Sequence, residues 1–165
     1  MFTKTMTLAL GAALIGTTAL AAETPVKEID VEADLAAIEN PAAAAHFATL
    51  ETDLEGRIAE LLTPENLVGA EAEGVKISVD IDELELASTW ANQADFAESK
   101  IAALVNVSSE DDHSKFDNYT LSVAYPDVLV FLPEGADASS LTMDSDIYYE
   151  AMLTAVADHI VTHLK

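Results

Sequence analysis

The clearest alternation of apolar and polar residues in the chain runs from Val75 to Ala87, with the sequence VKISVDIDELELA. Apolar side chains occupy every second position from Val75 to Ile81, which predicts a strand with one buried face. The alternation slips by one residue near Asp82 and Glu83 before two leucines continue it, and such a slip indicates a β-bulge. We therefore expect this strand to be central, with the rest of the chain covering or flanking it.

Two segments carry apolar residues at the spacings of three and four that are typical of helices. The first begins at Asn40-Pro41, a capping residue followed by a proline in the first turn, and ends before Thr63-Pro64. The second runs from about Ser145, which can cap its start, to Leu164. The predicted buried stripes consist of Phe47, Leu50, Leu54, Ile58 and Leu61 in the first helix, and of Tyr149, Met152, Leu153, Val156, Ile160 and Leu164 in the second.

Further strands are expected between these two helices. Residues Lys100 to Ser108 alternate as a strand but also fit a helix face. We favour a strand because Val105-Asn106-Val107 within the segment is β-prone and a polar loop follows at once. Tyr119 to Tyr125 alternate clearly and end at Pro126, which stops a strand. Val128 to Leu132 are expected to add a short fourth strand.

The segment before the first helix has ambiguous periodicity. Residues 22–40 mix acids with scattered apolar side chains, and Val31 to Ile38 could form one or two helical turns. We predict a docked N-terminal arm. Residues 41–165 then form a single α+β domain, a two-layer sandwich in which an antiparallel meander of three to four strands carries two amphipathic helices on one face.

The first 21 residues are expected to be a signal peptide. Lys4 precedes an apolar run, and Ala19-Leu20-Ala21 fits the cleavage pattern, which places cleavage before Ala22 or, alternatively, before Glu23. The run is too short to span a bilayer comfortably, so we expect no stable membrane insertion after cleavage. We predict a bacterial protein that is periplasmic or secreted.

Composition narrows the classes of function. The formal net charge of −23 becomes −24 when the leader and its one lysine are removed, which argues against nucleic acid and anionic membranes as partners. The chain has no cysteine, so it has no disulfide and no lipoprotein anchor. The acidity fits a well-solvated surface, and it also leaves carboxylates available for divalent cations.

Several short motifs resemble a family of small exported proteins of alphaproteobacteria that has no assigned activity. The resemblance covers about the first half of the mature chain and implies a location and an origin, but no residue role. It is carried by Asp34-Leu35, Ala37-Ile38-Glu39-Asn40, Asp53-Leu54 with Ile58, and Val79-Asp80-Ile81-Asp82-Glu83.

One candidate metal site lies on the second helix. His159 and His163 are four residues apart, so both rings could reach one zinc or copper ion. A third ligand would come from His46, Asp158 or an acid of the sheet edge. The H-E-x-x-H pattern of a metalloprotease is absent. The alternative explanation is that both histidines favour the negative C-terminal end of the helix.

A second candidate is the acidic loop of residues 110–117. Asp111, Asp112 and Asp117 concentrate the oxygen ligands that calcium prefers. The loop lacks the spacing of an EF-hand, so a solvated hairpin tip is the alternative explanation.

Catalytic motifs are scarce. Asp80 and Asp82 could form an acid–base pair only within a cleft that shifts one pKa, and the chain has neither a G-x-S-x-G motif nor a glycine-rich phosphate loop. We therefore predict a non-enzymatic binding or interaction module without a cofactor, which uses an exposed sheet face or edge strand for a protein partner. The alternative is a divalent metal-ion binding protein that uses His159 and His163 or the acidic loop.

Overall fold

The computed structural model describes residues 24–38, 40–64, 66–84, 99–110, 112, 116–142 and 144–164. The predicted signal peptide and the segment around Trp90 lie outside these ranges. The elements in chain order are β1 (Val26–Ala33), the 3-10 turn η1 (Leu35–Ala37), α1 (Pro41–His46), α2 (Leu50–Leu61), β2 (Val75–Leu84), β3 (Lys100–Ser108), β4 (Asp117–Ala124), α4 (Tyr125–Val128), η3 (Leu129–Phe131), η4 (Ala138–Ser140) and α5 (Asp146–His163).

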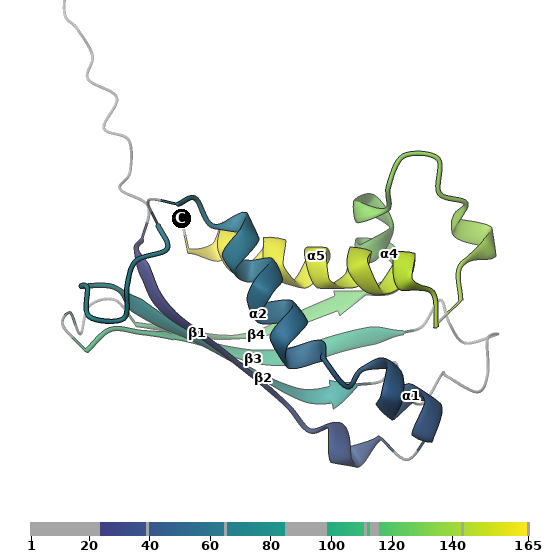
Figure 1. The fold of residues 1–165 in the computed structure, drawn as a ribbon, viewed down its shortest axis with the longest axis horizontal. Coiled ribbons are helices and arrows are strands. Elements are labelled where there is room, and N and C mark those ends of the chain that lie inside the picture. Colours follow the sequence, from purple (N-terminus) through teal and green to yellow (C-terminus); the bar gives the residue numbers. More distant parts are fainter. Residues whose placement is uncertain are drawn as a thin grey trace, which may run out of the picture.

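The fold is α+β, as predicted, and its helices pack on the sheet. Figure 1 shows α2 and α5 side by side above the four strands. The face under these helices holds the core, which includes Val75, Ile77, Val79 and Ile81 of β2, each at most 1% exposed. Within the described ranges, no helix has both the length and the apolar character that a membrane crossing requires.

The sheet has the order β1-β2-β3-β4, and its two halves differ in direction. The predicted meander is confirmed for β2, β3 and β4, which pair antiparallel. The expectation of a wholly antiparallel sheet is wrong, because β1 pairs parallel to β2. A parallel neighbour needs a long crossover, and the segment that contains α1 and α2 supplies it.

The N-terminal arm is therefore an edge strand. Its apolar residues Val26, Ile29 and Val31 do not alternate evenly, because the register between β1 and β2 shifts between Val26 and Glu28. This uneven spacing of apolar residues resembles that of a helix, so the strand could not be recognised from the sequence. The helical turn expected near this point is limited to η1.

The bulge predicted in β2 is confirmed. The register between β2 and β3 shifts between Asp80 and Glu83. Residues Lys100 to Ser108 form a strand, as we favoured, with alternate residues buried.

The predicted first helix is two helices. Asn40 caps α1, with its side-chain oxygen accepting from Ala42 N at 2.9 Å, as expected. The helix is then interrupted after His46, and the Thr49 hydroxyl donates to Asp53 Oδ2 at 2.7 Å where α2 begins. Residues 47–49 between the two helices form a turn, where one continuous helix was predicted.

The short strand predicted at Val128–Leu132 is wrong. Pro126 lies in the first turn of α4, and Asp127 Oδ2 accepts the Ala124 N–H at 2.9 Å. These residues start a helix directly after β4, and η3 continues it. Proline marks the end of a strand and the start of a helix equally well.

The C-terminal helix α5 begins as predicted, with Ser145 Oγ accepting from Tyr148 N at 3.5 Å. Its buried surface is wider than one stripe. Val161, which is outside the predicted stripe, is 8% exposed and lines the same small cavity as Leu61 and Leu62 at the end of α2. His163 is about half exposed.

Candidate functional site

The structure brings together one residue from each of the two predicted metal sites, the histidines of α5 and the acidic loop. His163 Nε2 of α5 lies 2.9 Å from Asp117 Oδ2, at the first residue of β4. The Tyr119 ring lies against the imidazole, with centroids 4.0 Å apart and planes inclined by 36°. Both partners of the pair are about half exposed, and ion pairs of this kind contribute about 0–1 kcal/mol to stability. The contact therefore fastens the end of α5 to β4 weakly.

His163 and Asp117 do not make a complete metal site. Among the described residues, no group of three or more His, Cys, Asp and Glu side chains could hold a metal ion. Zinc sites in proteins use three or four protein ligands. His46 packs against Tyr149 on α5. Tyr149 comes fourteen residues before His163 on the same helix, so about 21 Å of helix separates His46 from the contact between His163 and Asp117. His159 is exposed one turn before His163.

Two described carboxylates of the acidic loop, and the backbone of Asp112, make contacts within the protein. Glu110 pairs with Lys27 at 3.4 Å, and Asp117 Oδ1 accepts the Asn118 N–H at 2.9 Å. The Asp112 N–H donates to Ser109 Oγ at 3.2 Å. Asp111 lies outside the described residues, so calcium binding by this loop stays a prediction.

Asp80, one of the two carboxylates proposed for acid–base chemistry, lies toward the uncovered face of the sheet. Asp80 is exposed and pairs in register with Glu32 of β1. Together with Asp34 and Glu51, these acids line a hollow of about 500 Å³. The side chain of Asp82 lies outside the described residues. Because the charged groups that line this hollow are all acids, it disfavours anionic ligands.

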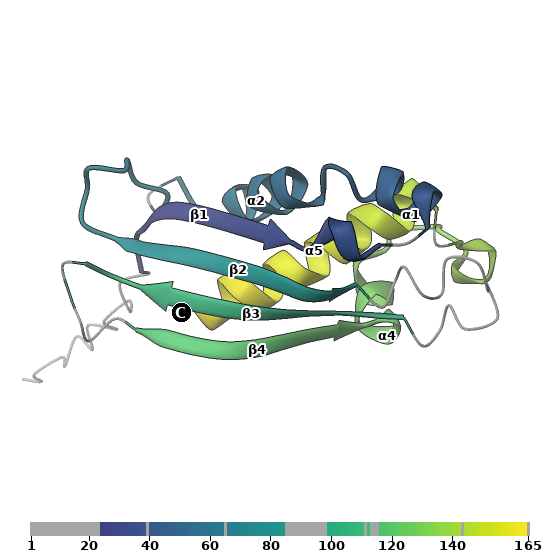
Figure 2. The same ribbon diagram turned by 90° about the horizontal axis from the view of Figure 1, so that it is seen from below.

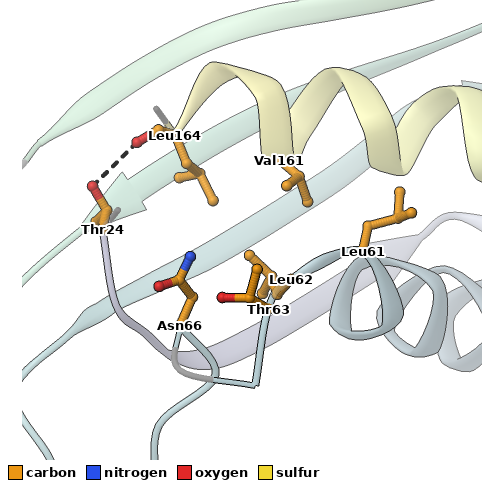
Figure 3. Close-up of a pocket in the computed structure, with 7 residues that line it drawn as sticks. All are labelled: Thr24, Leu61, Leu62, Thr63, Asn66, Val161 and Leu164. Atoms are coloured by element: carbon orange, nitrogen blue, oxygen red, sulfur yellow. Dashed lines mark hydrogen bonds between the residues drawn. The ribbon is translucent and has the colours of Figure 1, made fainter. Parts of the chain in front are cut away.

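Two cavities near the end of α5 are too small for a typical metabolite. The first holds about 40 Å³ and is bounded on one side by the bond from Thr24 Oγ1 to the Leu164 carbonyl, at 3.1 Å (Figure 3). The second, beside His163 and Phe116, holds about 190 Å³. Small-molecule sites usually hold about 300–1,000 Å³. The residues that line the first cavity are Thr24, Leu61, Leu62, Thr63, Asn66, Val161 and Leu164.

The outer edge of β1 is covered along much of its length. At its start, the Val26 N–H donates to the Asn66 carbonyl at 2.6 Å and the Val26 carbonyl accepts from Val68 N at 2.9 Å. Further along, two N–H groups point away from β2 and donate to carboxylates of α2. Val31 N donates to Glu55 Oε1 at 3.2 Å, and Ala33 N donates to Glu51 Oε1 at 2.9 Å.

The outer edge of β4 is open at its centre. Tyr125 N donates to the Ser99 carbonyl at 3.0 Å, and the register with β3 is regular, so the alternation points the N–H groups of residues 118, 120, 122 and 124 outward. Asp117 and Asp127 accept from residues 118 and 124. The Thr120 and Ser122 N–H groups have no acceptor among the described residues. No described element lies along this edge (Figure 2).

The side of β4 that faces the helices is partly buried. Burial raises the pKa of the Tyr119 phenol to about 12, and the nearby Asp117 carboxylate raises it further. The Tyr119 hydroxyl is buried and has no hydrogen-bond partner among the described residues. The strand thus presents a covered apolar side, an uncovered polar side and an open edge.

Sequence reasoning missed the residues that distinguish the two edges. The spacing of Glu51 and Glu55 places both on one flank of a helix, but only the position of α2 beside β1 shows what they contact. A compositional signal was present. The strand β1 has the sequence VKEIDVEA, with four charged residues, whereas β4 has the sequence DNYTLSVA, with one.

The comparisons add no relative to this picture. No protein-family model, no curated protein and no solved structure matches the chain. The resemblance to exported alphaproteobacterial proteins therefore stays a prediction.

Proposed function

We propose that this protein is a non-enzymatic, exported binding module that takes an extended segment of a partner protein as an added strand along β4. The observation that carries the proposal is the pair of outward N–H groups at Thr120 and Ser122, which have no acceptor among the described residues. A peptide that adds to a sheet edge supplies such acceptors, and the main-chain hydrogen bonds provide the affinity.

The composition of β4 supports this assignment. Edge strands that avoid pairing carry lysines, prolines, inward-pointing charges or a covering element. Between Asn118 and Ala124, β4 has no charged residue and no proline. The side chains of Thr120 and Ser122 are exposed on the uncovered face, where they leave room for a neighbouring strand.

The leader sequence supports a location outside the cytoplasm. A periplasmic or secreted protein meets extended segments of other exported proteins, and the net charge of −23 keeps it soluble at the same time. Catalysis is not needed to account for any of the described contacts.

The test is a selection of displayed random peptides on the immobilised mature protein, followed by binding measurements with two variants. Ser122→Pro removes an outward N–H and places a ring in the path of the partner strand, and edge strands tolerate proline at such positions. Ser122→Ala removes the same hydroxyl and keeps the N–H. Selected peptides should bind wild type and Ser122→Ala equally and lose at least about tenfold in affinity for Ser122→Pro.

Circular dichroism and thermal unfolding verify that both variants are folded. Peptides that bind the two variants with equal affinity would place the binding site elsewhere. A selection that enriches no peptide would also count against strand addition as the function.

A further inference from the structure

We infer that the strand added to β4 is the β4 strand of a second copy of this chain, which pairs antiparallel to it, so that two four-stranded sheets join into one mixed sheet of eight strands. The inference rests on the proposed function and names the partner. The two open N–H groups belong to residues 120 and 122 and are symmetric about Leu121. A two-fold axis at Leu121 makes this edge complementary to itself.

The capped ends of β4 select one register. With the axis at Leu121, residue 120 lies opposite residue 122 of the partner, and each of these pairs exchanges two backbone hydrogen bonds. Moving the axis to Thr120 would require the Asn118 N–H, which already donates to Asp117. Moving it to Ser122 would require the Ala124 N–H, which already donates to Asp127. The Leu121 register uses only the N–H groups that are open.

The side chains agree with this register. Thr120 lies opposite Ser122 of the partner on the uncovered face, and a threonine–serine pair is favourable across strands. On the helix side, Leu121 lies opposite its own copy, and Tyr119 lies opposite Val123 of the partner. Aromatic and β-branched residues form a favourable cross-strand pair. Moving the axis by one residue shifts the pairing by two residues, which keeps the two faces but loses every one of these pairs.

Charge opposes the contact at the two ends of the shared segment. Residue 118 lies opposite residue 124 of the partner in this register, so the Asp117 carboxylate at the Asn118 N–H approaches the partner's Asp127 carboxylate at the Ala124 N–H. At longer range, two mature copies repel one another, because the formal net charge of −23 becomes −24 in each when the leader and its lysine are removed. Salt screens that repulsion, because the Debye length is about 10 Å at 0.1 M and 3 Å at 1 M. Added sodium chloride should therefore strengthen the dimer.

The register is testable because the chain has no cysteine of its own. Thr120→Cys and Ser122→Cys each place one thiol on the exposed face. Opposed residues of a hydrogen-bonded pair have Cα atoms about 5.5 Å apart, within the range of a disulfide. Residue 120 and its own copy are diagonal neighbours about 7–8 Å apart, which is too far.

The experiment oxidises an equal mixture of the two variants, one of which carries a mass tag, and compares the disulfide products. The mixed disulfide should exceed either homodisulfide by at least about tenfold. In sedimentation equilibrium, wild type and Ser122→Ala should show a dimer that strengthens with salt, and Ser122→Pro should stay monomeric.

Three outcomes would overturn the inference: random disulfide pairing, equal dimerisation of Ser122→Pro and Ser122→Ala, or a monomer at every protein and salt concentration. The proposed function is judged separately. A protein that is monomeric but selects peptides sensitive to Ser122→Pro would retain strand addition with a different partner, whereas a dimer insensitive to this variant would remove support from both.

Discussion

The two outer strands of the sheet, β1 and β4, have the same length, but they differ in how far the backbone groups on their outer edges are hydrogen-bonded. The β1 backbone is bonded at its start to residues 66 and 68, and further along it donates to the carboxylates of Glu51 and Glu55. The β4 backbone is capped only at its ends, by Asp117 and Asp127, among the described residues. The difference comes from the segments beside each edge, because α2 and residues 66–68 lie along β1 and no described element lies along the centre of β4.

The comparison shows that the crossover between β1 and β2 also protects the outer edge of β1 from pairing with another chain. The helix α2 connects β1 to its parallel neighbour β2, and the same helix presents the two glutamates to β1. An unpaired strand edge is a template for association, and the carboxylates occupy that template within the molecule. At β4, α4 presents one such carboxylate, Asp127, at the end of the strand, and no described helix offers an acceptor to the Thr120 and Ser122 N–H groups. The two edges should therefore respond differently to substitution, and each prediction below changes one edge or the element that covers it.

The largest effect is expected from Leu54→Ala in α2. Leu54 is 0% exposed and lies in the turn between the two glutamates. Deleting a buried leucine side chain costs about 2–5 kcal/mol in the free energy of unfolding, because a cavity is left behind. We expect a loss in this range in urea unfolding, together with faster amide exchange at Val31 and Ala33.

A matched substitution on the exposed side of α2, Glu60→Ala, serves as the control and should change stability by less than about 0.5 kcal/mol. Slow exchange at Val31 and Ala33 in Leu54→Ala would mean that β1 is covered independently of α2 packing.

The second prediction compares two prolines in β4. The Leu121 N–H points toward β3, and the Ser122 N–H points outward. Leu121→Pro should lower the free energy of unfolding by at least about 1–3 kcal/mol more than Ser122→Pro, because it leaves a carbonyl of β3 without its donor. Urea unfolding of both variants measures the difference, and equal losses would show that the outward direction assigned to Ser122 is wrong.

Sequence patterns predicted the parts of the fold that depend on regular local spacing. The central strand β2 with its bulge, the strands β3 and β4, and the helix α5 with its serine cap all follow from alternation, helical spacing or capping. Patterns failed where local irregularity hid a tertiary contact. The β1 strand was obscured by its register shift, and the segment after Pro126 was misread because proline both ends strands and begins helices.

The candidate site was less accessible to sequence reasoning. The spacing of His159 and His163 on α5 predicted a shared metal ion, and that site stays a prediction. Spacing alone did not show that His163 contacts Asp117. The distinction between the two edges depends on which N–H groups point outward and on which helix lies beside them. Both properties arise only in the assembled sheet. In the sequence, the contrast in charge between β1 and β4 is what indicates them.

The third prediction removes the cover of β1 without changing the core. Glu51→Ala and Glu55→Ala each leave one outward N–H without its acceptor, and each should cost about 1 kcal/mol. The double variant should also acquire a second open edge and associate further than a dimer in sedimentation experiments. Glu60→Ala, which removes a carboxylate from the same helix, is the control. Unchanged association in the double variant would mean that the charged side chains of β1 prevent pairing on their own.

The smallest effect is expected at alkaline pH from Tyr119 on the inner side of β4. Its pKa is raised from the usual value near 10 to about 12, chiefly by burial, so the folded state favours the neutral phenol. The stability that this group contributes is complete below about pH 10 and is lost as the pH rises toward 12. Tyr119→Phe keeps the ring against His163 and removes the ionisation.

The free energy of unfolding of Tyr119→Phe should therefore fall less steeply than that of wild type between about pH 10 and 12, and the two proteins should differ little at pH 7. Urea unfolding at several pH values measures the slopes. Tyr148 and Tyr149 also have raised pKa values, because both are buried, and they contribute equally to the two proteins. Parallel slopes would mean that the Tyr119 hydroxyl is in contact with water, and the inner side of β4 would then be less covered than the helix layer indicates.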